Sequence, residues 1–202
     1  MKTLAAAAAL AATLVPALAS AGPVEWTIDP DHTQIGFRVR HMMVSWTRGH
    51  FRRFEGKVLL DEQAPERSRV EVKIDPASID TAMPKRDEHL RSADFLHVER
   101  FPTMSFTSTT VKRAAGGKLK VLGELTLHGV TRPVVLEVQG LGAPTRDLWG
   151  GMRRGATART TLSRKEFGLV WNTALETGGV AVGDEVHVEL EVELVKATPG
   201  QG

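Results

Sequence analysis

The sequence contains no cysteine and no tyrosine, and aromatic residues make up only 5% of its 202 residues. Without cysteine, a disulfide scaffold, a thiol nucleophile and a zinc–thiolate site are all excluded. The net charge of +2 is close to neutral and no run of five basic residues occurs, which excludes a general nucleic-acid binder that neutralises many phosphates. This length and a hydrophobic content of 42% suit one domain of ordinary size.

One long apolar run is present, at the N-terminus. Lys2 gives a positive start, residues 3–18 are almost purely Ala, Leu and Val, and residues 19–21 form a small-x-small site. This pattern is typical of a secretory signal peptide over residues 1–21. A membrane anchor is the alternative, but the run is interrupted by Pro16 and is short for a span of roughly 20 residues. We therefore expect cleavage after Ala21 and, from the bacterial character of the signal, a periplasmic protein.

Apolar and polar residues alternate along most of the remaining chain, which is the pattern of strands that are buried on one face. The alternation is cleanest near the C-terminus, where Val186, Val188 and Leu190 alternate with His187 and Glu189. We count about eight such strands, separated by Gly- and Pro-containing turns. One short helix is predicted, from Pro84 to Arg91, because proline suits a first helical turn. Residues 22–196 are predicted to form a single domain, and residues 197–202 a disordered tail.

Strands with one apolar face must bury that face against other strands, in a sandwich or in a closed barrel. A barrel also removes the exposed sheet edges that invite aggregation. Eight strands enclose either a packed core or a cavity for a small ligand. The strand pattern alone leaves both possibilities open.

Five segments carry a resemblance to a known family, in their order and spacing along almost the whole domain. They are residues 26–41 (WTIDPDHTQIGFRVRH), 78–81 (SIDT) with 86–95 (RDEHLRSADF), 101–108 (FPTMSFTS), 123–134 (GELTLHGVTRPV) and 182–186 (VGDEV). Together these segments resemble the YceI-like family. One local departure is Phe95-Leu96-His97, where members of the family often carry two aromatic residues and an acid.

The resemblance implies an all-β fold, a lipocalin-like antiparallel β-barrel of about eight strands with one short helix. Members of this family are often periplasmic, and some bind long isoprenoid lipids inside the barrel. The resemblance thus implies a binder or carrier of a polyprenyl lipid or an isoprenoid quinone, with no cofactor.

Two sets of residues are candidates for ligand binding. An ordinary filled core is the alternative for the inward apolar faces, and the few large side chains and the small residues at 155–158 weaken it. Together with these features, the family resemblance implies that the inward faces line a cavity. The candidate cavity residues are Ile35, Phe37, Val39, Phe106, Leu125, Leu127, Trp171 and Leu190. Titratable residues at the predicted helix and at the end of a neighbouring strand are candidates to meet a lipid head group at the barrel mouth, since arginine suits phosphate. These are His41, Arg86, Asp87 and His89; structural ion pairs that tie the helix to the barrel are an equal alternative for the helical residues.

Other functions remain as alternatives. The density of titratable groups at the predicted mouth is compatible with an enzyme that acts on a lipid head group, although no nucleophile elbow or phosphate loop occurs. A stress-related structural protein with a filled core is the third hypothesis. No histidine pair has the spacing of a helical zinc site, so no metal site is predicted. Trp46 and Trp149 are expected in loops, where simple loop packing is the favoured interpretation; the alternative is an exposed indole at the barrel rim, which would help a transient membrane contact.

Overall fold

The computed structural model describes residues 22–176 and 178–197. Most of these residues lie in strands: β1 (Val24–Ile28), β2 (Gln34–His41), β3 (Ser45–Phe51), β4 (Phe54–Leu60), β5 (Arg69–Ile74), β6 (Ile79–Asp80), β7 (Met104–Arg113), β8 (Leu119–Leu127), β9 (Val130–Gln139), β10 (Thr145–Arg146), β11 (Met152–Ser163) and β12 (Val182–Lys196). The α-helix is α1 (Pro84–Arg91), and short 3₁₀ segments cover Pro65–Arg67, Pro76–Ser78, Ala115–Gly117 and Arg164–Phe167. The predicted signal peptide and nearly all of the predicted tail lie outside the described residues.

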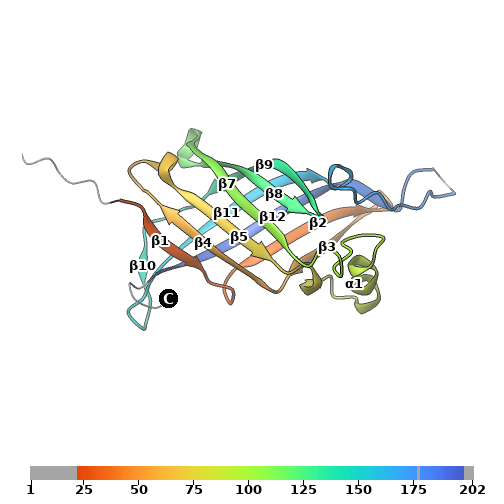
Figure 1. The fold of residues 1–202 in the computed structure, drawn as a ribbon, viewed down its shortest axis with the longest axis horizontal. Coiled ribbons are helices and arrows are strands. Elements are labelled where there is room, and N and C mark those ends of the chain that lie inside the picture. The colour runs from red at the N-terminus through yellow and green to blue at the C-terminus, as the bar shows by residue number, and fades with distance from the viewer. Residues whose placement is uncertain (1–21, 177, 198–202) are drawn as a thin grey trace, which may run out of the picture.

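The strands form one antiparallel sheet that closes on itself (Figure 1). The closed ring runs β11–β9–β8–β7–β5–β4–β1–β12, and β12 then pairs with β11 to complete it. Strand β12 is 15 residues long, so its first part pairs with β2 and its last part with β1. Strands β3 and β6 extend the sheet beyond β2. The predicted barrel of about eight strands is confirmed.

Several inward side chains at the middle of the barrel keep part of their surface accessible, although neighbours such as Ile35 and Ala158 are buried. On β12, Val188, Leu190 and Val192 point inward and are only half-buried, whereas Glu189 and Glu191 on the outer face are exposed. In a barrel filled by its own side chains, the side chains at the central positions would have almost no accessible surface. The remaining exposure of these residues shows that the middle of this barrel is hollow.

Helix α1 lies at one end of the elongated barrel, and β10 lies at the opposite end (Figure 1). The helix begins at Pro84 and ends at Arg91, as predicted, because the proline ring fixes a helical φ and lacks only an N–H that needs no partner there. Its one apolar residue, Leu90, packs with the buried Ile79, Leu96 and Met104. The helix and the segment after it therefore cover this end of the barrel with apolar side chains.

Trp46 lies on β3 and is half-buried, so the expectation that it occupies a loop is wrong. It is directly opposite Arg40 in the β2–β3 register, and its ring packs edge-on against the His187 ring on β12. The indole thus packs against side chains of β2 and β12, which are not its neighbours in the sequence. The residues next to Trp46 in the chain therefore do not reveal that it is half-buried. Trp149 does lie in a loop, between β10 and β11, as expected. Among the described residues, no helix has the length and apolar character needed to span a bilayer.

Candidate ligand-binding site

The barrel encloses a cavity of about 310 Å³. Its volume lies at the lower end of the range of roughly 300–1,000 Å³ that is typical of small-molecule sites. Among the residues that the structure describes, no ionisable side chain contributes to the wall, and the polar side chains in it are Thr33, Ser68 and Thr160. An apolar chain is the ligand that suits such a wall, because a charged group placed there would lose its hydration without gaining a partner.

The cavity wall contains six of the eight residues that the sequence proposes for it: Ile35, Phe37, Phe106, Leu125, Leu127 and Leu190. Val39 and Trp171 are not part of the wall. Val39 lies near the end of β2; its register partner Val186 lines the cavity, but Val39 itself does not. Trp171 packs against Phe95, with ring centroids 5.1 Å apart. Whether the six wall residues bind a ligand remains a prediction.

At the α1 end, four residues from outside the strands also line the cavity, and strand periodicity does not reveal them. They are Leu90, Phe95, Leu96 and Leu169. The first three belong to α1 and the segment that follows it, and Leu169 follows the 3₁₀ segment after β11. One signal was present in the sequence, since Leu90 is the single apolar residue between Lys85 and Arg91. A lone leucine in an otherwise charged helix marks the side that must be buried.

Two of the candidate head-group residues fasten the helix to the barrel. The buried Asp87 carboxylate accepts hydrogen bonds from the Thr81 backbone N–H (2.9 Å) and from the Thr81 hydroxyl (2.5 Å). Arg86 donates from Nε to the Thr81 hydroxyl (2.8 Å) and from Nη2 to the Thr81 carbonyl (2.7 Å). The hydrogen bonds of Thr81 therefore hold the start of α1 at the end of β6, which favours the structural alternative for these two residues.

The other two candidates lie elsewhere. The Nε2 atom of His89 is 2.8 Å from an Asp94 carboxylate oxygen, and its ring packs edge-on against Phe95 and Trp171. His41 is exposed at the end of β2. The structure thus does not bring the four residues into one polar pocket, and a head-group role for His89 and His41 remains a prediction.

The two ends of the cavity are closed in different ways. At the α1 end the closing side chains are apolar or aromatic, with Phe95 between the cavity and the rings of His89 and Trp171. At the β10 end the inward Arg154 is buried, donates to the Gly142 carbonyl and pairs with Glu62 (2.6 Å). The Arg154 guanidinium also lies 5.3 Å from the centre of the Trp26 ring. An apolar chain that passed the β10 end would separate the buried Arg154 from its partners, whereas the apolar side chains that face the cavity at the α1 end lose only dispersion contacts when they move.

Comparison with known proteins agrees with this architecture. The family model described as "YceI-like domain" matches residues 26–194. The chain belongs to the YceI-like family. It is 42% identical over 160 residues to Protein YceI of Salmonella newport, a match that covers 78% of this chain and 83% of that protein. The family resemblance read from the sequence motifs is confirmed.

Solved structures share the same barrel. The Campylobacter jejuni YCEI protein matches with a TM-score of 0.67 at 26% identity, over 79% of this chain and 90% of that one. BcnA of Burkholderia cenocepacia matches with a TM-score of 0.71 at 22% identity, over 85% of this chain and 99% of that one. A polyisoprenoid binding domain from Saccharophagus degradans, implicated in plant cell wall breakdown, matches with a TM-score of 0.61 at 15% identity, over 86% and 99%. The last two show the fold alone.

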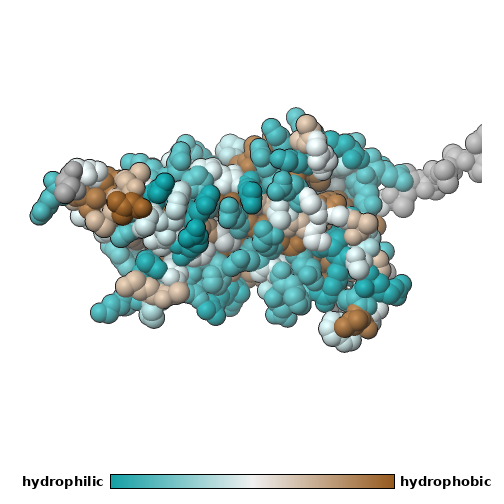
Figure 2. Space-filling view, turned by 180° about the vertical axis from the view of Figure 1, so that it is seen from behind, coloured by the Kyte–Doolittle hydropathy of each residue, from teal (hydrophilic) through white to brown (hydrophobic). Residues whose placement is uncertain are grey.

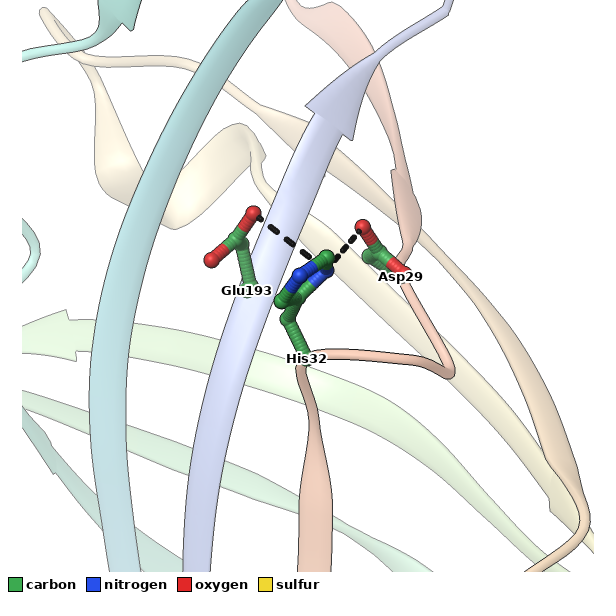
Figure 3. A group of neighbouring side chains, drawn as sticks. All are labelled: Asp29, His32 and Glu193. Atoms are coloured by element: carbon green, nitrogen blue, oxygen red, sulfur yellow. Dashed lines mark hydrogen bonds and ion pairs between the residues drawn. The ribbon is translucent and has the colours of Figure 1, made fainter. Parts of the chain in front are cut away.

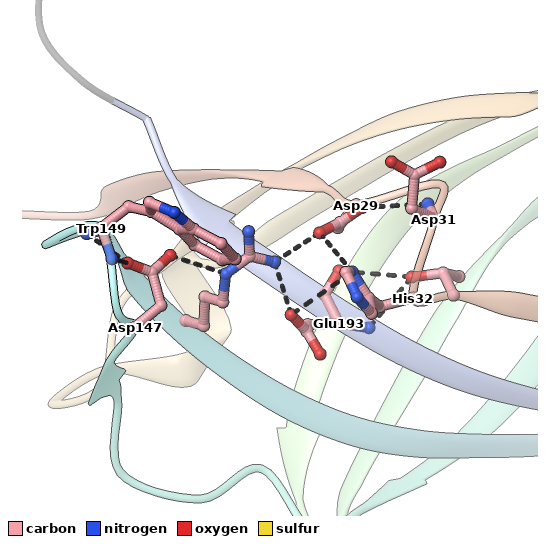
Figure 4. Close-up of polar contacts among 9 residues, drawn as sticks. Asp29, Asp31, His32, Asp147, Trp149 and Glu193 are labelled. Carbon is pink, nitrogen blue, oxygen red and sulfur yellow. Dashed lines mark hydrogen bonds and ion pairs between the residues drawn. The ribbon is translucent and has the colours of Figure 1, made fainter.

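The outer surface of this YceI-like barrel carries a polar network near its β10 end. His32 Nδ1 lies 2.9 Å from an Asp29 carboxylate oxygen and 3.9 Å from one of Glu193 (Figure 3). A histidine and two carboxylates this close resemble a metal-ligand set. However, Arg153 Nη1 donates to both carboxylates, and its Nε donates to Asp147 (2.8 Å). The guanidinium therefore already supplies the positive charge that a metal ion would bring, and the group is an ion-pair network (Figure 4).

The network shifts the titration of its members. Burial alone would raise the pKa of Asp29, but the hydrogen bonds from His32 and Arg153 outweigh it and lower the pKa from 3.8 to about 2. The hydrogen bond to Asp29 raises the pKa of His32. Because the Asp29 side chain is only 10% exposed, solvent screens these interactions weakly. The network joins the β1–β2 loop to β11 and β12 across the sheet.

Replacing Asp29 with asparagine is expected to lower the free energy of unfolding by about 2 kcal/mol at neutral pH, because one pKa unit corresponds to about 1.4 kcal/mol. The lowered pKa means that the carboxylate stabilises the fold fully above the ordinary value of 3.8, and that this contribution is lost as the pH falls toward about 2. Urea denaturation across this pH range checks the prediction. The difference between wild type and Asp29→Asn should shrink on acidification, and Asp31→Asn, which removes an exposed neighbouring carboxylate, should have little effect at any pH. A difference that is constant with pH would contradict this account.

Proposed function

We propose that this protein is a periplasmic carrier that holds the chain of an isoprenoid lipid inside its barrel. The observation that carries the proposal is the apolar, uncharged cavity in the middle of a closed barrel. The cavity also makes the filled-core structural protein the weaker alternative. The polyisoprenoid binding domain of Saccharophagus degradans has the same fold, which supports the choice of an isoprenoid over other apolar chains.

Burial of apolar surface supplies the affinity in this proposal. Each methylene group that leaves water for the cavity contributes roughly 0.8 kcal/mol. The wall offers no charged partner along the chain, so recognition depends on the width and apolar character of the ligand. We therefore expect tolerance of chain length, with the part of the chain that exceeds the cavity leaving at one end.

The head group is placed at the α1 end in this proposal. The β10 end is closed by the Arg154–Glu62 pair, whereas the side chains that face the cavity at the α1 end, such as Phe95 and Leu96, are apolar. His89 lies just outside Phe95 and can donate or accept a hydrogen bond there. A quinone oxygen or a prenyl phosphate suits such a neighbour. Extraction of the bound lipid distinguishes these two head groups. No reaction at the head group is proposed, because the four candidate residues do not share one pocket.

Expression of the full chain in a Gram-negative host tests both parts of the proposal. We expect the protein in the periplasmic fraction, with a mature N-terminus at Gly22, and we expect organic extraction of the purified protein to release a prenyl lipid. Lipid-free protein should then bind geranylgeraniol more tightly than a straight-chain alcohol with the same number of carbons, measured by titration calorimetry. Retention in the cytoplasm would overturn the localisation, and lipid-free protein that takes up no geranylgeraniol would overturn the carrier function.

A further inference from the structure

The turn between β2 and β3 exposes apolar side chains at a point where the backbone is strained. Met42 and Met43 have φ values of +50° and +59°. Hairpins usually place Asn-Gly where two successive residues need positive φ, because side chains without local hydrogen bonds are unfavourable there. Val44 follows them and is 79% exposed. Folding alone would favour different residues at all three positions, so their apolar character points to a contact outside the barrel.

Two other segments bring apolar residues to the same place. The Met42 backbone N–H donates to the Ala181 carbonyl (2.8 Å), and the Ala181 N–H donates to the Thr173 carbonyl (2.9 Å). These bonds place the segments that contain Val170 and Val180 beside the turn, and both valines are exposed. Apolar residues gather at this end of the molecule (Figure 2). We refer to Met42, Met43, Val44, Val170 and Val180 as the apolar tip.

Positive charge and an indole flank the apolar tip. Arg40 and Arg38 lie over the Trp46 ring, with the guanidinium carbons 4.3 and 4.9 Å from its centre. Arg48 on β3 is exposed, and no ion pair involves Arg40 or Arg48 within the described part of the chain. The acids at this end of β12 are Asp184, which pairs with Lys165 (2.7 Å), and the exposed Glu185, whose carboxylate lies 4.0 Å from His187 Nε2. Apolar side chains bordered by tryptophan and arginine suit the boundary between lipid tails and anionic head groups.

We propose that the apolar tip docks this protein on an anionic phospholipid surface, with Arg40 and Arg48 facing the head groups. This inference rests on the proposed function, and it specifies the end of the barrel at which lipid enters and leaves. The tip is at the α1 end, where the described side chains that face the cavity are apolar, so docking there places the membrane next to the route that a prenyl chain takes in the proposed function.

A second group of exposed apolar side chains lies at the other end of the molecule, and it is the control for the apolar tip. Leu148 and Trp149 project from the β10–β11 loop, where Trp149 is 84% exposed. The Asp147 carboxylate accepts hydrogen bonds from the backbone N–H groups of Trp149 and Gly151, so the loop is held in shape (Figure 4). Its neighbours are the carboxylates of the Arg153 network, and the Arg154 pair seals the cavity there. This loop is therefore not the site of lipid exchange.

Flotation with vesicles of phosphatidylglycerol and phosphatidylcholine tests the proposal. The variant Met42→Asn/Met43→Gly/Val44→Thr removes the apolar groups of the turn and supplies the residues that positive φ favours, so the fold is retained. We expect its partition onto these vesicles to fall by about tenfold or more, since a factor of ten needs only about the burial of two methylene groups. Leu148→Ser/Trp149→Ser at the opposite end should bind the vesicles as the wild type does.

Two further measurements separate the possible outcomes: vesicle binding by arginine variants, and geranylgeraniol binding in solution. Arg40→Gln/Arg48→Gln should weaken binding to anionic vesicles and leave the weak binding to pure phosphatidylcholine unchanged. The triple turn variant should still bind geranylgeraniol in solution. Failure of the wild type to float with anionic vesicles, or loss of flotation only in the Leu148/Trp149 variant, would overturn the docking proposal and leave the tip to a protein partner. Failure of the wild type to bind geranylgeraniol would instead overturn the proposed function.

Discussion

Replacing Val188 with tryptophan is expected to abolish binding of an isoprenoid chain. Val188 lies near the middle of β12, lines the cavity and pairs with Phe37 on β2 and Thr160 on β11. An indole at this position projects into the space that the lipid chain must occupy. We expect the affinity for geranylgeraniol to fall by at least about tenfold, which corresponds to about 1.4 kcal/mol, as measured by titration calorimetry.

The same variant also tests whether the barrel is hollow in solution. An added side chain in a filled core costs about 1–3 kcal/mol of stability through strain, whereas an added side chain in an empty cavity gains contacts. We therefore expect the unfolding temperature of Val188→Trp to equal or exceed that of the lipid-free wild type. Glu191→Trp, at an exposed outward position on the same strand, is the matched control and should change neither quantity. Normal affinity in Val188→Trp would mean that the lipid chain lies elsewhere.

The interior position of Val188 could be predicted from the sequence, because alternation along β12 depends only on the two-residue period of a strand. The same is true of Phe37, Leu125 and Leu190, which all line the cavity. The number of strands in the closed ring also followed, within one, from counting alternating segments. What the period does not show is which inward positions border the hollow, which is why Val39 was placed in the wall although it is not part of it.

The cavity itself could not be derived from strand periodicity. An inward face that fills a core and an inward face that surrounds a cavity have the same pattern of apolar residues. The difference arises from which segments cover the ends, and those contacts join residues far apart in the sequence. Trp171 illustrates this, because its partners Phe95 and His89 are more than seventy residues away in the chain. The family resemblance, and not the pattern, supplied the expectation of a ligand chamber.

Arg164 was not among the predicted site residues, although the structure makes it central to the α1 end. The side chain is buried within the fold. Its guanidinium donates from Nε to the Gly183 carbonyl (3.0 Å) and from Nη1 to the carbonyls of Leu169 (2.5 Å) and Trp171 (2.8 Å). One arginine thus satisfies backbone groups of two segments that are separated in the sequence. Nothing local in the sequence distinguishes it from the exposed arginines of the chain.

Replacing Arg164 with methionine is expected to lower the free energy of unfolding by about 3–5 kcal/mol, because it leaves buried carbonyls without a donor. Urea denaturation measures this loss. Lys165→Met is the matched control, since Lys165 is half exposed and pairs with the same Asp184. An exposed pair of this kind contributes about 0–1 kcal/mol. Equal effects of the two substitutions would show that charge, and not the hydrogen bonds to the carbonyls, is what matters at Arg164.

The Arg164 variant has a functional consequence as well. Leu169 lines the cavity, and Trp171 covers the outer side of Phe95, so the carbonyls that Arg164 holds belong to the segment that closes the α1 end. Under conditions in which Arg164→Met remains folded, we expect faster release of bound geranylgeraniol, measured by its transfer to acceptor vesicles. Lys165→Met should release the lipid at the wild-type rate. An unchanged release rate in Arg164→Met would mean that this segment does not control access, and that the chain leaves the barrel at another point.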